Sequence, residues 1–169
     1  MKIEIVQAST DGQLEQVRDL MRALISWQRQ RYHDVVELVD KYYDEGGFEA
    51  DLAGLPGRFA PPKGRLLLAL DDGQPAGCVA LHDLSDDTCE MKRMFVDVDL
   101  QGRGIGRALA NALIREARSA GYQRMRLDTG IRQVEAQNLY RSLGFKEIEP
   151  SFPLPEELRG GILFFKLAL

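Results

Sequence analysis

The sequence predicts a mixed α/β (α+β) fold built on one central, mostly antiparallel sheet. Three strand-like runs follow one another over residues 65–98 with only short turns between them, which indicates an antiparallel meander. A glycine turn and a helical stretch then separate this meander from a strand-like run at 124–128, and such a crossover makes its two strands parallel. The length of 169 residues is most simply a single domain, residues 1–169.

The N-terminal part predicts one strand followed by a long helix. Residues 2–8 alternate as a strand does, and Thr10 with Gln13 forms a capping box that opens a helix through about residue 31. One face of this helix is apolar: Leu14, Val17, Met21 and Leu24.

Residues 34–55 are expected to be helical at first and irregular after Gly46-Gly47. The segment is strongly acidic, with Asp34, Glu37, Asp40, Asp44, Glu45, Glu49 and Asp51 against the single base Lys41. Two interpretations stay open: a solvated surface, or an electrostatic attraction for a cationic amine.

The remaining elements are predicted from the periodicity of the apolar residues and from the turn residues between them. The expected strands are 65–70, 75–84, 88–98, 124–128, 145–148 and 162–167, with a helix from the glycine turn to about Ala120 and a second helix at 133–142. Gly121 and Gly144 terminate the two helices, and the apolar stripe of the second is Ala136, Leu139 and Leu143.

Composition excludes several classes of protein. A formal charge of −4 and a pI near 5.3 argue against a general binder of nucleic acid or of anionic membranes. Cys78 and Cys89 lie in strand-like runs and are expected to be buried, inert thiols without a metal site. His33 and His82 have no obvious partner and are expected to be structural or solvated. No signal peptide or membrane span is recognisable, so a cytoplasmic location is expected.

Residues 94–107 join a strand to a helix through Gly102, Gly104 and Gly106. Such a turn aims free backbone N–H groups and the positive end of a helix at one point, which suits a phosphate or pyrophosphate, although it also occurs for packing alone. Arg107 follows Gly106 where a P-loop needs Lys, and it occupies the place of the third glycine of a dinucleotide fingerprint. Both nucleotide-binding patterns are therefore weakened.

The run Gln101-Gly102-Arg103-Gly104-Ile105-Gly106 resembles the pyrophosphate loop of the GNAT superfamily of N-acetyltransferases, Gln/Arg-x-x-Gly-x-Gly/Ala. A second GNAT signature, Ala-x-x-x-Tyr-x-x-x-Gly-Phe, is matched by Ala136, Tyr140, Gly144 and Phe145. Glu90 to Val96 is similar to the fourth strand of that family. The resemblance covers residues 65–148.

This resemblance implies a sheet whose fourth and fifth strands splay apart, with helices on both faces. It implies that acetyl-CoA binds there as co-substrate, without a metal, and that the acetyl group goes to a primary amine of a small molecule or peptide. The implied cofactor-binding residues are Met94, Phe95 and Val96 for the pantetheine arm, Gln101, Gly102, Arg103, Gly104, Ile105, Gly106 and Arg107 for the diphosphate, and Gln133 in place of a usual asparagine.

Two side chains are expected to carry the chemistry. The resemblance places the hydroxyl of Tyr140 beside the sulfur of the thioester, where it would protonate the leaving thiolate. The other interpretation of Tyr140 is a core tyrosine whose hydroxyl is hydrogen-bonded elsewhere. Glu90 is the candidate base for the amine, on the expectations that a partly dry cleft raises its pKa and that it shares a strand face with Val96. An ion pair of Glu90 with Lys92 or Arg93 is the other interpretation.

A non-catalytic acyl-CoA-binding sensor is the alternative function, because it needs the loop but neither Tyr140 nor Glu90. No nucleic acid or membrane partner is expected. The apolar C-terminal end, residues 162–169, is expected either to pair with a second subunit in a homodimer or to be covered within the same chain.

Overall fold

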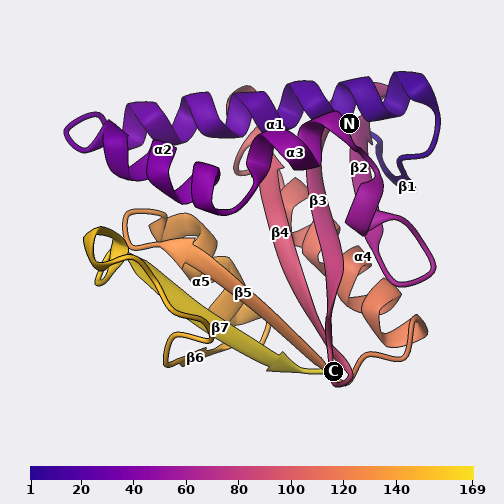
Figure 1. Ribbon diagram of the computed structural model, residues 1–169. Coiled ribbons are helices and arrows are strands. Elements are labelled where there is room, and N and C mark those ends of the chain that lie inside the picture. Colours follow the sequence, from indigo (N-terminus) through magenta and orange to yellow (C-terminus); the bar gives the residue numbers. More distant parts are fainter.

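A seven-stranded sheet runs through the molecule in the order β1-β2-β3-β4-β5-β7-β6 (Figure 1). The computed structural model describes all 169 residues. The strands are β1 Ile3–Gln7, β2 Arg65–Asp71, β3 Gln74–Ser85, β4 Thr88–Val96, β5 Arg124–Gly130, β6 Lys146–Ile148 and β7 Ile162–Ala168. Only β4 and β5 pair in parallel, and all other neighbours are antiparallel. The predicted meander and the predicted parallel crossover are both confirmed.

Helices cover both faces of this sheet (Figure 1). They are α1 Asp11–Arg31, α2 Val36–Glu45, α3 Phe48–Ala53, α4 Ile105–Ser119 and α5 Val134–Ser142, with short 3-10 turns at Gly57–Phe59, Val98–Leu100 and Glu156–Leu158. One core cluster joins α1, α2 and α3 to one face of β2, β3 and β4, and a second joins α4 to the opposite face. None of the helices combines the length and the apolar character needed to cross a membrane.

The first helix begins as its sequence predicts. The Thr10 side chain accepts a hydrogen bond from the Gln13 N–H, and the Gln13 side chain accepts in return from the backbone N–H of Thr10. The predicted apolar face, Leu14, Val17, Met21 and Leu24, is buried.

The expectation of irregular chain after Gly46-Gly47 is wrong, because α3 begins at Phe48. Gly47 has φ +72°, which ends α2 and redirects the chain. Phe48 and Leu52 of the new helix are buried, so packing stabilises a helix too short to be stable alone.

A one-residue bulge interrupts β4 at Arg93. Ala80 lies opposite Lys92 and Cys78 lies opposite Phe95, so two residues of β4 face the single Val79 of β3, and Arg93 has φ +59°. The bulge reverses the alternation of side chains along the rest of the strand. Phe95 therefore packs with α1 whereas Val96 packs on the α4 face.

The C-terminal strand β7 lies between β5 and β6 and pairs with both. It is thus covered within the same chain, and the edges of the sheet are β1 and β6. Cys78 and Cys89 are free and buried as expected, and burial raises the pKa of each thiol to about 12.

Candidate functional site

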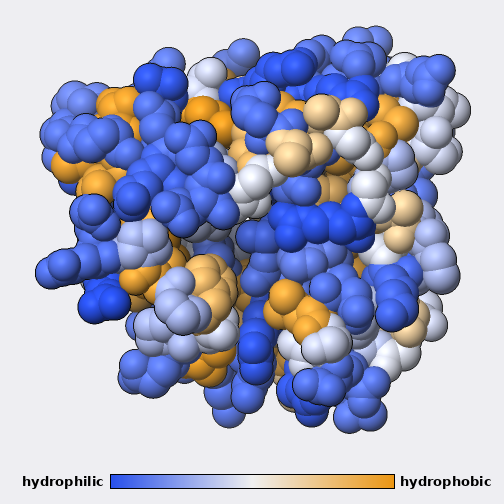
Figure 2. Space-filling view, in the orientation of Figure 1, coloured by the Kyte–Doolittle hydropathy of each residue, from blue (hydrophilic) through white to orange (hydrophobic).

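The parallel strands β4 and β5 stay paired only at their beginnings and then separate. The pairs are Thr88 with Arg124, Cys89 with Met125, and Glu90 with Arg126. Beyond them lies a cavity of about 650 Å³, lined by parts of α1, α2, β4, the glycine turn, β5 and α5. The surface is hollowed between the helices α1–α3 and the β5–β7 region (Figure 2). Ligands of open sheets commonly bind beyond the carboxyl ends of parallel strands, and this cavity occupies that position.

The glycine turn presents unpaired backbone donors to this cavity. Seven consecutive N–H groups, from Gln101 to Arg107, donate no hydrogen bond within the chain, and the first bond of α4 is Ala108 N–H to Gly104 C=O at 3.0 Å. Gly102 and Gly104 have φ +78° and +84°, and a β-carbon at either would project into open space. Gly104 is the N-cap of α4 and has no side chain to satisfy these donors. The result is an anion-binding arrangement at a helix N-terminus.

Most of the residues predicted for a cofactor line the cavity. They are Met94, Phe95, Val96, Gln101, Gly102, Gly104, Ile105, Gly106, Arg107 and Gln133. Arg103 does not line it; its side chain is exposed and reaches the Asp99 carbonyl at 3.5 Å. The Gln101 side-chain amide donates a 3.2 Å hydrogen bond to the Val96 carbonyl, so this carbonyl of β4 accepts from a group outside the sheet.

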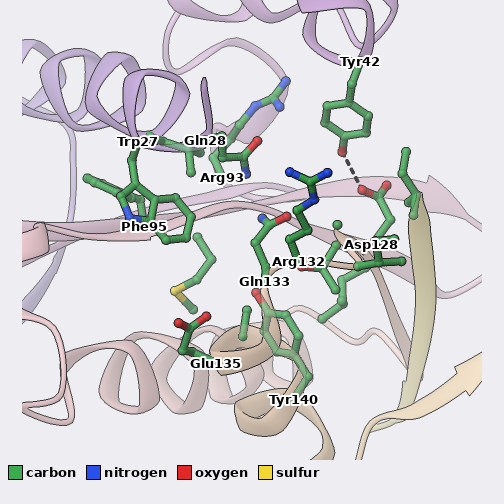
Figure 3. A pocket seen from close by; sticks show the side chains of 18 of the residues that line it. Trp27, Gln28, Tyr42, Arg93, Phe95, Asp128, Arg132, Gln133, Glu135 and Tyr140 are labelled. Atoms are coloured by element: carbon green, nitrogen blue, oxygen red, sulfur yellow. Dashed lines mark hydrogen bonds between the residues drawn. The ribbon is translucent and has the colours of Figure 1, made fainter. Parts of the chain in front are cut away.

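Tyr140 of α5 also lines the cavity (Figure 3). Its ring packs against Phe145 and Phe165, with centroid distances of 5.8 and 6.4 Å, and its hydroxyl has no hydrogen-bond partner in the chain. Burial, followed by the charge of Asp128, raises the pKa of Tyr140. The buried face of α5 is formed by Tyr140 and Gln137, whereas the predicted stripe of Ala136, Leu139 and Leu143 is only half-buried.

Glu90 lies outside the cavity, and both expectations on which its predicted role rested are wrong. The bulge at Arg93 places Glu90 and Val96 on opposite faces of β4. The Glu90 carboxylate is 3.1 Å from His82 Nε2 and 2.9 Å from Lys92 Nζ. Burial raises the pKa of Glu90, but the hydrogen bond with His82 and the charge of Lys92 outweigh it and lower the pKa to about 2.

The arrangement found is therefore an ion pair of Glu90 with Lys92. His82, expected to lack a partner, is buried and is held by Glu90. A role of Glu90 as base stays a prediction that the geometry does not favour.

One wall of the cavity is apolar and aromatic. It comes from α1, α2 and the turn between them, together with Phe95 of β4, and its half-buried members are Trp27, Tyr32, Val35, Leu38 and Tyr42. Trp27 and Phe95 pack together with ring centroids 6.3 Å apart (Figure 3).

Polar contacts fasten this wall to the turn between β5 and α5. Arg31 pairs with Glu135 at 2.6 Å, and Arg132 pairs with Asp34 at 2.5 Å. The Tyr32 hydroxyl donates to Gln133 Oε1 at 3.0 Å. The two sides of the cavity are thus joined at its rim by residues about 100 positions apart.

The carboxylates of the acidic segment 34–55 do not face the cavity, although apolar and aromatic residues of the same segment do. None of its seven carboxylates lines it, and four of them are ion-paired: Asp34 with Arg132, Asp40 with Arg29, Glu45 with Lys41 and Asp51 with Arg58. The solvated-surface interpretation is the one that fits this placement.

A carboxylate that the sequence did not single out does face the cavity. Asp128 of β5 accepts a 2.5 Å hydrogen bond from the Tyr42 hydroxyl of α2 (Figure 3). Burial is the largest influence on Asp128 and raises its pKa. The sequence feature that could have pointed to Asp128 is its position near the carboxyl end of a strand that follows a crossover, where ligands of open sheets commonly bind. Its partner Tyr42 had no such signal, because it lies 86 residues away.

Comparisons with known proteins agree with this geometry. The model of the acetyltransferase (GNAT) family matches residues 21–145. An uncharacterized N-acetyltransferase of Schizosaccharomyces pombe is 35% identical over 133 residues, which is 72% of this chain and 82% of that protein. The IAA acetyltransferase of Azospirillum brasilense is 38% identical over 117 residues, 69% of this chain and 74% of that protein. Among solved structures, the PaiA N-acetyltransferase of Thermoplasma acidophilum in complex with coenzyme A is similar in fold, with a TM-score of 0.76, 18% identity and 100% of each chain covered.

Proposed function

Because the chain belongs to the GNAT family of acetyltransferases, we propose that it moves an acetyl group from acetyl-CoA to a primary amine of a small molecule or peptide. The observation that carries the proposal is the row of seven free N–H groups from Gln101 to Arg107, in which every residue except Arg103 lines the cavity. Main-chain donors beside a helix N-terminus bind diphosphates, and coenzyme A contains one.

The residues present fit this co-substrate. Open space stands where side chains at Gly102 and Gly104 would project, so a diphosphate can approach the backbone closely. The open side of β4 offers main-chain groups around Met94 and Val96 to the amides of the pantetheine arm, and Gln133 stands on the facing wall. Acetyl-CoA supplies an acetyl group activated as a thioester.

The protein's own groups would then orient the reactants and manage charge. Holding amine and thioester together in one cavity supplies a large part of the acceleration. A backbone N–H of β4 would stabilise the oxyanion that forms on the acetyl carbonyl. Tyr140, whose hydroxyl has no other partner in the chain, would donate a proton to the departing thiolate.

A two-part experiment tests the proposal. Thermal unfolding is measured with acetyl-CoA, CoA, ATP and NAD, and a ligand at one hundred times its Kd should add about 2.7 kcal/mol to the free energy of unfolding. Release of free CoA thiol is then followed with acetyl-CoA and a panel of amines: 2-phenylethylamine, spermidine, aspartate and a lysine-containing peptide. We expect stabilisation by acetyl-CoA and CoA, and thiol release with at least one amine.

The other outcomes separate the alternatives. Stabilisation by acetyl-CoA without thiol release from any amine would favour a non-catalytic acyl-CoA sensor. Stabilisation by ATP or NAD alone would indicate a nucleotide-binding protein and overturn the proposal.

A further inference from the structure

The cavity contains a carboxylate that the acyl-transfer proposal has not used. We propose that Asp128 accepts the proton that the acceptor ammonium must lose before it attacks the thioester, and that Tyr42 positions the Asp128 carboxylate for this step. The inference rests on the proposed function and assigns the base of its reaction.

Asp128 stands where the two strands have separated. The last β4–β5 pair is Glu90 with Arg126, so Asp128 lies two residues beyond the end of the pairing. Its side chain enters the opened space from β5, and Tyr42 reaches it from α2 (Figure 3). The carboxylate is held by one hydrogen bond and keeps further acceptor positions for a donor in the cavity.

The other carboxylates of the cavity are exposed, and one of them is also ion-paired. Besides Asp128, its lining includes Glu135 and Glu157. Glu135 is exposed and is bound by both terminal nitrogens of Arg31, at 2.6 and 3.1 Å. Glu157 lies on an exposed turn at the rim. Asp128 is the partly buried carboxylate of this lining and has no ion pair.

The surroundings of Asp128 suit a proton acceptor. The charged and titratable groups that influence or face it are Tyr42 and Tyr43 of α2, Glu90, Lys92 and Arg93 of β4, and Tyr140 of α5. Burial raises the pKa of Asp128, while the charge of Lys92 and the hydrogen bond from Tyr42 act in the opposite direction. A carboxylate with a raised pKa is a stronger base than an ordinary one, which suits the acceptance of a proton. Tyr42 remains a donor, because burial raises its own pKa well above the ordinary value.

Asp128 and Tyr140 border the same space. Both line the cavity, and Figure 3 shows them extending from different walls. The charge of Asp128 is the second cause that raises the pKa of Tyr140, after burial. An acceptor nitrogen between them would have a proton acceptor on one side and a proton donor on the other.

The step balances without any further reactant. An N–H bond of the ammonium breaks and its proton goes to the Asp128 carboxylate, which leaves a lone pair on nitrogen. The nitrogen forms a bond to the acetyl carbon, and the π electrons of the carbonyl move to its oxygen. When the carbonyl re-forms, the C–S bond breaks and the thiolate takes a proton from Tyr140. The amide nitrogen then loses its second proton to solvent, and Asp128 and Tyr140 exchange protons with solvent to return to their starting states.

The test compares amines that differ in charge. Asp128→Asn keeps the shape of the side chain and an oxygen that accepts from Tyr42, but it cannot take the proton. With 2-phenylethylamine, or the fastest charged amine of the panel, we expect kcat/KM at pH 7 to fall by about 100-fold, with the KM for acetyl-CoA unchanged. With 2,2,2-trifluoroethylamine, which is mostly uncharged at pH 7, the loss should be only a few-fold, because no proton has to be removed before attack.

Tyr42→Phe provides a second readout. The hydrogen bond from Tyr42 stabilises the charged form of Asp128, so its loss should raise the pKa of Asp128. We expect the acidic limb of the kcat/KM profile to move to higher pH, a displacement that a purely structural role of Tyr42 would not produce. Asp44→Asn, an exposed unpaired acid on the same helix, is the matched control and should leave the profile in place.

The outcomes distinguish the two levels of proposal. Equal losses of Asp128→Asn on charged and uncharged amines, or a retained acidic limb, would overturn the assignment of Asp128 while leaving acetyl transfer intact. Loss of that limb in Glu90→Gln instead would assign the base to Glu90. If the wild-type protein acetylates no amine, the function itself fails.

Discussion

Tyr32 and Gln133 meet over the bare Cα of Gly130. The Tyr32 hydroxyl donates to Gln133 Oε1 at 3.0 Å, and a β-carbon on Gly130 would lie 2.1 Å from each of these two oxygens. The glycine thus makes room for the contact that joins the apolar and aromatic wall of the cavity to the N-terminus of α5.

Gly130→Ala should separate these two side chains. Both oxygens are at the ends of side chains that can move, so we expect a modest loss of about 1 kcal/mol in the free energy of unfolding, typical of one lost hydrogen bond. Because Gln133 is a predicted cofactor contact, the KM for acetyl-CoA should rise. Gly12→Ala, where an added methyl group meets nothing within 4 Å, is the control and should leave this KM unchanged. An unchanged KM in Gly130→Ala would mean that the contact does not support the cofactor side.

Gly104→Ala should weaken binding of acetyl-CoA more than it weakens the fold. The turn of β2 and β3 offers a matched control, because Gly73 has the same φ of +84° and the same open surroundings. An alanine at either position must adopt a left-handed backbone conformation, which lowers the free energy of unfolding by about 1–2 kcal/mol. Only at Gly104 would the methyl group enter the space expected for the diphosphate. Calorimetric titration should show a large loss of acetyl-CoA affinity in Gly104→Ala and none in Gly73→Ala; equal affinities would disprove the assignment of the loop.

The features that sequence reasoning predicted are those encoded locally. The capping box of Thr10 and Gln13 and the glycine turn at Gly102 and Gly104 each lie within a few residues of chain. Their geometry follows from the residue types themselves, because a short polar side chain caps a helix and glycine adopts a positive φ.

The bulge at Arg93 could not be predicted in this way. Arginine resists a positive φ, and no glycine or proline marks the position. Tertiary contacts of the Arg93 side chain stabilise the bulge. The guanidinium is buried between Tyr43 and Phe48, 5.3 and 5.0 Å from their ring centroids, and lies 3.4 Å from Asp51. Because α2 and α3 supply these contacts, the side-chain alternation of β4 depends on helices that the strand sequence does not contain. The bulge at Arg93 is the reason why Glu90 and Val96 do not share the strand face that the sequence predicted.

Glu90→Gln should destabilise the protein in a pH-dependent way. The pKa of Glu90 is lowered to about 2 in the fold, so its stabilising effect is fully present above the unfolded pKa of about 4.5 and is lost as the pH falls toward 2. A shift of this size corresponds to about 3 kcal/mol at neutral pH. Urea unfolding at pH 7 should show a loss of this order, and the difference from wild type should narrow below about pH 4.5. Glu37→Gln, which changes an exposed acid on α2, should show no such difference. A loss of stability in Glu90→Gln that is the same at every pH would refute the ion-pair account.

Tyr140→Phe should separate catalysis from binding and from stability. The hydroxyl bonds to no other residue, so its removal leaves no buried partner unsatisfied, and we expect the free energy of unfolding to stay within about 0.5 kcal/mol of wild type. The ring and its contacts with Phe145 and Phe165 remain, so the KM for acetyl-CoA should be unchanged. If the hydroxyl protonates the thiolate, kcat should fall by about 100-fold. Since the pKa of Tyr140 is raised, the wild-type kcat should show no alkaline limb from this group below about pH 10. Undiminished kcat in Tyr140→Phe would show that the Tyr140 hydroxyl is not the proton donor to the thiolate.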